Sequence, residues 1–551
     1  MYLKPEFTAL LQNNDVPSEL TILEVTESLK APLNELQEIE TEIQRLRKLM
    51  ETMNIKRQSI QKIIDDHNMI LSPARRLPRD VLHEIFLHCL PTNRNPTAEY
   101  SESPLLLTRI CSSWRAIALS SPRMWSKVHI PLSNPSFSSG YGMITDETIR
   151  RQRFADVLRS RSGTVRRWLS RSGTCPLSLS IMHPDYLSGS TDYEIAREMS
   201  NTLLSFADRW SEIDLSMPED VYNELQSNID PTKFSSLKSL KIILHRRYLR
   251  NNSQPPPIQL LAAPGLCRIT INAMWTTLHM TRNLVQPIWN HITHLTLASM
   301  ITDKHLLVLL RQCPKLLFGN FMVNASAWRN EAIVNQEEAH LPSLESLAID
   351  DYGAQEMMTI LFHAIKAPEL TRLSYQCSTR RSHDEDDSTI PLPVPVIPLL
   401  KNSVLISDLL LYGVLSSQDT QECLRHGARV TRVVFGKPPP TNAPPHRNPD
   451  ILCPDTFDLR ILSIGSLVVT PLPRLESLEA YQLSRLTDED LLDLITSRIN
   501  AFKRGETAAL KSVKIYFLRS RQQDITEDVS RLAKEAGIEV KLDLTYLPES
   551  S

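Results

Sequence analysis

The C-terminal two thirds of the chain repeats one short apolar pattern, L-x-x-L-x-L, in which one residue separates the last two apolar positions. This alternation is typical of a β-strand with one buried face. The clear copies are Trp210/Ile213/Leu215, Leu237/Leu240/Ile242, Leu266/Ile269/Ile271, Ile292/Leu295/Leu297, Leu344/Leu347/Ile349 and Leu370/Leu373/Tyr375. The weaker copies are Leu316/Gly319/Phe321, Ile406/Leu409/Leu411, Val430/Val433/Phe435, Leu475/Leu478/Ala480 and Leu510/Val513/Ile515. Each strand of such a chain must be buried against neighbouring copies of the pattern.

The spacing of the copies predicts a leucine-rich-repeat-like solenoid over residues 206–551. Four of the five intervals between neighbouring clear copies are 26 to 29 residues, within the range of about 20 to 29 residues for these repeats. The fifth, from Ile292 to Leu344, is 52 residues and equals two units of 26 with the weaker copy at Leu316 between them. The position that carries Asn or Cys in such repeats holds His245, Met274, Met300, Tyr352 and Ser378 instead. We therefore expect an irregular α/β solenoid, and a plain stack of amphipathic α/β units stays open as the alternative.

Helices are expected behind the strands and at the end of the repeats. Two similar segments begin with an apolar residue followed by Thr302-Asp303 and Thr487-Asp488, and threonine is a good N-cap. A helix over 525–536, with Gly537 after it, and a strand over 538–544 are expected to cap the solenoid.

A heptad pattern of apolar residues predicts a coiled-coil helix over residues 33–71, after a flexible segment 1–32. The pattern runs through Leu36, Ile39, Ile43, Leu46, Met50, Met53, Ile60, Ile64 and Leu71. Arg57 and His67 interrupt it. A helix with this stripe pairs with a second copy, pairs with another chain or packs on the body of the protein, and the sequence leaves these alternatives open.

Residues 75–130 are expected to form a small helical module. Leu77-Pro78 begins its first helix, because proline at the first helical position costs little. An apolar face follows at Val81, Leu82, Ile85, Phe86, Cys89 and Leu90. After a polar loop come Leu105-Leu106-Leu107, Ile110-Cys111-x-x-Trp114-Arg115 and Pro122-x-x-Trp125. A module this small cannot bury so many large apolar residues, so some are expected to be available to a partner.

Residues 131–205 are expected to link this module to the repeats. Alternation at Leu177, Leu179 and Ile181 predicts one strand, and Gly173 suits the end of a preceding helix. The arginines between residues 150 and 171 are expected to form a solvated helix face rather than a nucleic-acid site. Within the repeats, the charged and Pro-rich segments 380–398 and 437–454 are expected to be exposed loops.

The motifs of residues 75–130 closely resemble the F-box, over about 50 of the 551 residues. The preceding heptad helix, which ends in Leu71-Ser72-Pro73-x-Arg75-Arg76, is similar to that of the expanded F-box family of mushroom-type fungi. The long loop after Leu90 departs from short F-boxes. Cys313-Pro314-Lys315-Leu316 resembles the link of cysteine-containing leucine-rich repeats in F-box proteins.

This resemblance implies a three-helix module that binds a Skp-type adaptor and, through it, a cullin. The chain would then be the substrate adaptor of an SCF-type E3 ubiquitin ligase, and its repeats would bind a target for ubiquitin-dependent degradation. The residues implied to bind the Skp adaptor are Leu77, Pro78, Val81, Leu82, Ile85, Leu107, Ile110 and Trp114. The alternative is a leucine-rich-repeat scaffold that binds proteins without any coupling to ubiquitination.

Composition and motifs argue against several other classes of protein. The chain has 14 glycines and no Gly-rich phosphate loop, which argues against a Rossmann or P-loop enzyme. A net charge of −2 provides no general attraction for nucleic acid or anionic membranes. There is no C-x-x-C pair and no catalytic motif, so we expect no enzyme, metal or cofactor. We expect a multidomain α+β protein located in the cytoplasm or nucleus.

Overall fold

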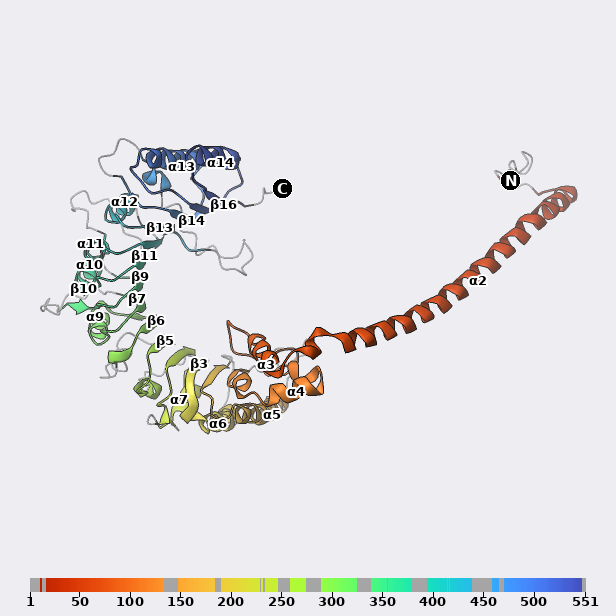
Figure 1. Ribbon diagram of the computed structural model, residues 1–551, viewed down its shortest axis with the longest axis horizontal. Helices are drawn as coiled ribbons and strands as arrows, with labels where there is room; N and C mark the ends of the chain where they lie inside the picture. The colour runs from red at the N-terminus through yellow and green to blue at the C-terminus, as the bar shows by residue number, and fades with distance from the viewer. Residues whose placement is uncertain are drawn as a thin grey trace. The chain divides into compact units, whose positions relative to one another are not determined.

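The computed structural model describes residues 10–11, 16–132, 147–183, 190–227, 229–230, 233–245, 258–273, 289–324, 338–353, 355–377, 394–413, 415, 417–438, 458–464 and 470–547. The protein is a mixed α and β structure with a long N-terminal helix and a large parallel sheet (Figure 1). This confirms the mixture of helices and strands predicted from the sequence. The chain divides into two units, Met1–Glu84 and Ile85–Ser551.

Helix α2 (Glu19–Leu71) dominates the first unit and is followed by the 3-10 turn η1 (Pro73–Arg76). It begins well before Leu33, so residues 19–32 are helical, and the flexible segment expected there is wrong; residues 1–9 and 12–15 lie outside the described residues. The Ser18 hydroxyl caps the helix by accepting a hydrogen bond from the Thr21 N–H at 3.3 Å. Pro32 lies inside the helix and removes one backbone hydrogen bond, which a helix of 53 residues tolerates.

Residues 75–130 contain two α-helices, α3 (Arg79–His88) and α4 (Ser112–Leu119). The 3-10 turns η2 (Leu107–Arg109) and η3 (Pro122–Trp125) accompany them, in place of the third helix that the sequence resemblance implies. Prolines explain part of this difference, because Pro104 and Pro122 cannot donate the backbone hydrogen bond of a helix interior. The Cys111 sulfur caps α4 by accepting from the Trp114 N–H at 3.5 Å.

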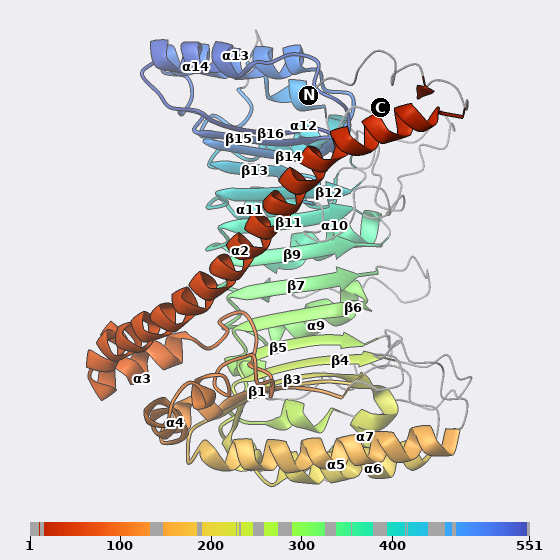
Figure 2. The same ribbon diagram turned by 90° about the vertical axis from the view of Figure 1, so that its right-hand side faces the viewer.

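The second unit contains one sheet of 14 parallel strands whose spatial order follows the chain (Figure 2). Its strands are β1 (Lys127–Pro131), β2 (Leu177–Met182), β3 (Trp210–Pro218), β4 (Ser239–His245), β5 (Arg268–Ala273), β6 (His294–Ile301), β7 (Phe318–Val323), β9 (Ser346–Asp351), β11 (Arg372–Cys377), β12 (Asp408–Gly413), β13 (Arg432–Phe435), β14 (Ser477–Leu483), β15 (Ser512–Phe517) and β16 (Lys541–Thr545). A separate pair of short strands is β8 (Ala339–His340) and β10 (Ile365–Lys366).

Helices or 3-10 turns lie between most successive strands, and α9 to α12 lie on one side of the sheet (Figure 1). The helices are α5 (Glu147–Arg171), α6 (Ser190–Leu204), α7 (Glu219–Ser227), α9 (Asp303–Arg311), α10 (Gln355–Ala364), α11 (Ile397–Asn402), α12 (Ser417–Arg425), α13 (Asp488–Lys503) and α14 (Thr526–Glu535). The turns are η5 (Ala207–Arg209), η7 (Gln259–Ala262), η8 (Trp289–His291) and η10 (Leu459–Leu462). The predicted N-caps are confirmed, because the hydroxyls of Thr302 and Thr487 accept from backbone N–H groups at 3.4 Å and 3.0 Å.

The strand positions predicted from the apolar pattern are the paired positions of this sheet. The second residues of the copies form one continuous row through Ile213, Leu240, Ile269, Leu295, Gly319, Leu347, Leu373, Leu409, Val433, Leu478 and Val513. The third residues form a parallel row two positions further along, and both rows are buried. The apolar pattern therefore determines the register of each strand against its neighbours.

Two further predicted boundaries differ from the structure. The sheet begins at β1 and β2, so residues 127–131 and 177–182 belong to it rather than to a link before it. These strands begin about 50 residues apart because α5 and its flanking residues separate them. Since this interval is longer than the expected repeat, the sequence pattern did not identify β1 and β2 as the first units of the sheet. Residues 394–398, expected in a loop, include the buried Val394 and the start of α11, whereas 380–393 and 439–457 lie outside the described residues.

We predict that Gly413→Ala destabilises the protein more than Gly505→Ala does. Both glycines have positive φ, +86° and +76° respectively, so both changes introduce backbone strain. A Cβ at Gly413 would lie 1.9 Å from the Cys377 carbonyl oxygen in the neighbouring strand, whereas a Cβ at Gly505 meets nothing within 4 Å. In urea unfolding we expect the free energy of unfolding to fall by about 1 kcal/mol for Gly505→Ala and by at least ~3 kcal/mol for Gly413→Ala. Equal losses would contradict this account.

Candidate functional site

The residues implied to bind the Skp adaptor differ in accessibility. Leu77, Val81 and Ile85 are 37%, 40% and 41% exposed, and Val81 and Ile85 lie one turn apart on α3. Pro78 is also exposed. Leu82 is 6% exposed and therefore belongs to the interior of the protein rather than to an accessible contact surface.

The remaining implied contact residues lie around η2 and α4 in the second unit. Ile110 is 54% exposed, whereas Leu107 is 4% exposed and is a core residue. Trp114 is half-buried, with its ring 4.9 Å from that of Phe86. Leu82 and Leu107 are both buried, so contact of either side chain with a partner would require rearrangement.

The second candidate is the face of the sheet that carries the alternate strand residues, here called the open face. One row across it runs through Lys127, Ser178, Glu212, Ser239, Arg268, His294, Phe318, Ser346, Arg372, Asp408, Arg432, Ser477, Ser512 and Lys541. Every residue of this row is partly or fully exposed. The open face is therefore a polar surface that extends across all 14 strands.

Opposite charges are paired along the open face. Arg268 lies 3.2 Å from Glu212, and Arg372 lies 2.8 Å from Asp408. Arg432 contacts Glu479 at 2.8 Å, and Lys241 contacts Asp214 at 2.9 Å. Such exposed pairs contribute little to stability, at about 0–1 kcal/mol each. Their arrangement instead places charged donors and acceptors side by side along the open face.

A pocket of about 630 Å³ lies on the open face at strands β1 to β4. His129 Nδ1 and Ser180 Oγ are 2.8 Å apart in it, and Ser178 Oγ donates to Asn95 Oδ1 at 3.2 Å. Burial, followed by the charge of Arg94, lowers the pKa of His129, although Asp214 and Glu102 oppose this shift. A neutral imidazole beside hydroxyl groups can exchange hydrogen bonds with a polar ligand near pH 7.

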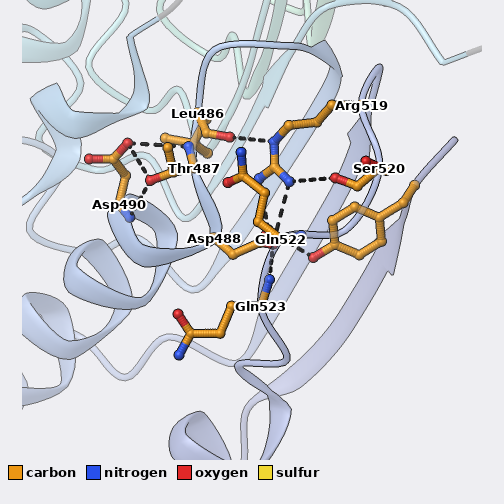
Figure 3. A network of polar contacts seen from close by, with 9 residues as sticks. Leu486, Thr487, Asp488, Asp490, Arg519, Ser520, Gln522 and Gln523 are labelled. Atoms are coloured by element: carbon orange, nitrogen blue, oxygen red, sulfur yellow. Dashed lines mark hydrogen bonds and ion pairs between the residues drawn. The ribbon is translucent and has the colours of Figure 1, made fainter. Parts of the chain in front are cut away.

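A buried polar cluster at the C-terminal end of the sheet is structural rather than a binding site (Figure 3). Asp488 is 0% exposed and accepts hydrogen bonds from Arg519 Nη2 at 2.7 Å and Tyr546 Oη at 3.0 Å. The N–H groups of Gln522 and Gln523 donate to it at 2.8 Å and 2.9 Å. These contacts join the start of α13 to the segment between β15 and α14 and to the residue after β16. All its acceptor capacity is used within the protein.

The electrostatics of Asp488 follow from these contacts. Burial raises the pKa of the carboxyl group, but the hydrogen bonds from Arg519, Gln523, Gln522 and Tyr546 together outweigh burial and lower it. Burial and the neighbouring Asp488 carboxylate raise the pKa of Tyr546 to about 12. The cluster therefore holds an ionised Asp488 and a neutral Tyr546 near pH 7.

The described residues show neither a metal centre nor a membrane span. Within these ranges, no group of three or more His, Cys, Asp or Glu side chains is placed to hold a metal ion. Of the helices described, none is both long enough and apolar enough to cross a membrane.

Comparisons with known proteins assign no family to the chain. No family model matches it, and no curated protein matches it. A solved protein from Bacteroides fragilis, determined as a structural genomics target, is 11% identical to it. That alignment covers 73% of this chain and 84% of the other with a TM-score of 0.25, which is too low to support an argument about fold or function.

Sequence reasoning located the strands but did not find the pocket on the open face. Its residues come from the loop after α3 and from four strands, so no local motif contains them. The polar residues between the paired apolar positions were the available signal, since alternate residues of a strand point to opposite faces.

We predict that Asp488→Asn lowers the free energy of unfolding by about 2–4 kcal/mol at pH 7, because Arg519 loses its buried counter-charge. The folded-state pKa of Asp488 is lowered, so its stabilising contribution is complete above the unfolded pKa of about 3.9 and is lost as pH falls through the folded value. The difference between wild type and variant in urea unfolding should therefore shrink below about pH 4.

The control is Asp543→Asn, which removes an exposed carboxylate that contacts Lys514 at 3.2 Å. This change should cost less than about 1 kcal/mol. A loss for Asp488→Asn as small as that of the control would show that the buried cluster does not hold the C-terminal end together.

Proposed function

We propose that the chain is the substrate-recognition subunit of an SCF-type E3 ubiquitin ligase, with an F-box-like module at residues 75–130 that binds a Skp-type adaptor. The carrying observation is the combination of Leu77-Pro78, Cys111-x-x-Trp114-Arg115 and Pro122-x-x-Trp125 with apolar side chains left accessible in that region. A helix face with Val81 and Ile85 in water is stabilised when a complementary apolar surface covers it.

We assign the binding of a target protein to the open face of the sheet, as part of an irregular leucine-rich-repeat solenoid. The support is the stacking of 14 strands in chain order, each paired to the next at its buried apolar positions. Extended repeat surfaces of this kind bind partners through the exposed residues between the buried ones. This assignment gives the chain itself no catalytic step, since the ligase partners perform ubiquitin transfer.

A protein-binding scaffold without coupling to ubiquitination is the alternative function. The open face supports it equally well, because target binding is common to both proposals. Binding of a Skp-type adaptor and a cullin separates them.

We predict that wild-type chain captures a purified Skp-type adaptor and, through it, a cullin, and that Leu77→Ala/Pro78→Ala reduces capture at least about tenfold. The reason is the loss of the apolar contact at the start of α3, since truncating a central contact residue typically costs more than about 1 kcal/mol. The matched control is Val308→Ala/Val404→Ala, which truncates two exposed apolar side chains in the repeats, 42% and 62% exposed. No capture by wild type, or equal capture by both variants, would reject the adaptor proposal.

We also propose that α2 self-associates as a coiled coil with a second copy of the chain. The helix is about 80 Å long at 1.5 Å per residue, and no residue in it is buried. Its heptad residues Leu36, Ile43 and Met50 are 52%, 42% and 66% exposed. A stripe of this length is stabilised by burial against an identical stripe.

We predict that light scattering of the full chain gives a mass above the 62.8 kDa of one copy. Ile43→Glu/Met50→Glu places charges on the heptad seam and should return the mass to that of one copy. Thr41→Glu/Gln44→Glu adds the same charge away from the seam and should leave the mass unchanged. A wild-type chain that stays monomeric at every concentration measured would reject self-association through α2.

A further inference from the structure

A pocket of about 780 Å³ lies between the loop before η2, helix α4 and helix α5, all within the second unit. Four arginines line it: Arg109, Arg115, Arg167 and Arg171. The other lining residues used below are Tyr100, Thr108, Thr164 and Trp168. No acidic side chain is among its described lining residues, so the pocket concentrates positive charge in a chain with net charge −2.

Each of these guanidinium groups is positioned by a neutral neighbour. Arg109 lies over the Tyr100 ring at 5.2 Å, and Arg171 lies over the Trp125 ring at 4.7 Å. Arg115 Nε donates to the Thr108 carbonyl oxygen at 2.6 Å. Arg167 donates to the Thr164 hydroxyl at 3.4 Å. These contacts hold the side chains in place but use few of the five N–H donors that each guanidinium carries.

In the part of the chain that the structure describes, other arginines of the same unit form ion pairs with carboxylates, and the four pocket arginines do not. Arg372 and Arg432 on the open face contact Asp408 and Glu479. Arg159, on the same helix as Arg167, contacts Asp156 at 3.2 Å. Among the described residues, no carboxylate forms an ion pair with any of the four pocket arginines. Their charges repel one another, and a multiply charged anion would remove that repulsion.

We propose that this pocket binds a phosphate group carried by a ligand. Guanidinium forks match the oxygen geometry of phosphate and can donate two hydrogen bonds each. The hydroxyl group of Tyr100 offers a further donor at the same pocket, whereas those of Thr108 and Thr164 already donate to the carbonyl oxygens of Leu105 and Ser160 at 2.7 Å and 3.0 Å. The volume lies within the range of about 300–1,000 Å³ for ligand sites, so it accommodates the phosphate and a part of the group that carries it.

The geometry favours a single bound phosphate group over a nucleic-acid backbone. A backbone site needs a track of cations, whereas these arginines converge on one pocket, and the open face beyond it carries paired charges of both signs. The phosphate can come from a phosphorylated side chain of a protein or from a free phosphorylated compound. Both sources present the same chemistry to the arginines, and the experiment distinguishes them.

The test is isothermal titration of the full chain at fixed low salt with three probes. They are pyrophosphate, a degenerate phosphoserine peptide library and the same library without phosphate. The test variant is Arg109→Gln/Arg167→Gln, which removes two pocket charges on different elements. The control is Arg166→Gln, a neighbouring exposed arginine that contacts Thr202 and does not line the pocket. Far-ultraviolet circular dichroism and thermal melting verify that both variants fold as wild type does.

We expect at least one phosphate probe to bind wild type and Arg166→Gln equally, with at least about tenfold weaker binding to Arg109→Gln/Arg167→Gln. Tighter binding of the phosphopeptides identifies a phosphorylated protein as the source, and tighter binding of pyrophosphate identifies a free compound. The proposal is overturned if neither phosphate probe binds, if the unphosphorylated library binds equally well, or if the double variant binds like wild type. Arg115→Gln/Arg171→Gln repeats the test should the first double variant unfold.

Discussion

The rest of the structure depends on the two buried rows of apolar side chains that cross the 14-stranded sheet. Each strand relies on its neighbours to bury its apolar side chains. Leu240, for example, is paired with Ile213 on one side and Ile269 on the other, and the same arrangement continues along the sheet. Stability in such an arrangement is a sum of contacts between neighbours. Glycine at position 413 follows from the same requirement, since a Cβ there would collide with the Cys377 carbonyl oxygen of the adjacent strand.

A sheet built from neighbour contacts has two ends that must be closed, and the two ends are closed differently. At the first strand, the loop after α3 pairs with β1, where the His129 N–H donates to the Pro96 carbonyl oxygen at 2.7 Å. The Trp125 and Trp168 rings meet edge to face there at 4.9 Å. At the last strand, the Asp488 cluster ties the terminal segments together, and β16 carries the charged Lys541 and Asp543. Covered and charged edges both discourage pairing with another chain.

Sequence patterns predicted the strands and helix starts that short-range periodicity encodes, and missed the features that depend on contacts between residues far apart in the chain. The strands from β3 to β15 were predictable because each carries its own apolar triplet, and Thr302 and Thr487 identified helix starts for the same local reason. Strand β1 was not predictable, since its neighbour β2 is separated by helix α5. The Asp488 cluster and the arginine pocket join residues far apart in the chain, so no spacing in the sequence marks them. The long loop after Leu90 acquires a structural role as the cover of β1.

If the open face binds a target protein as proposed, the pairing of opposite charges on it has a consequence for how that protein arrives. The opposite charges of each ion pair, Arg268 with Glu212 and Arg372 with Asp408, cancel beyond a few ångströms. These pairs therefore do not attract a charged protein from a distance. Encounter there is governed by diffusion and by the fit of the two surfaces once they touch. Selectivity on this surface then resides in how long a correct partner stays rather than in how quickly it is found.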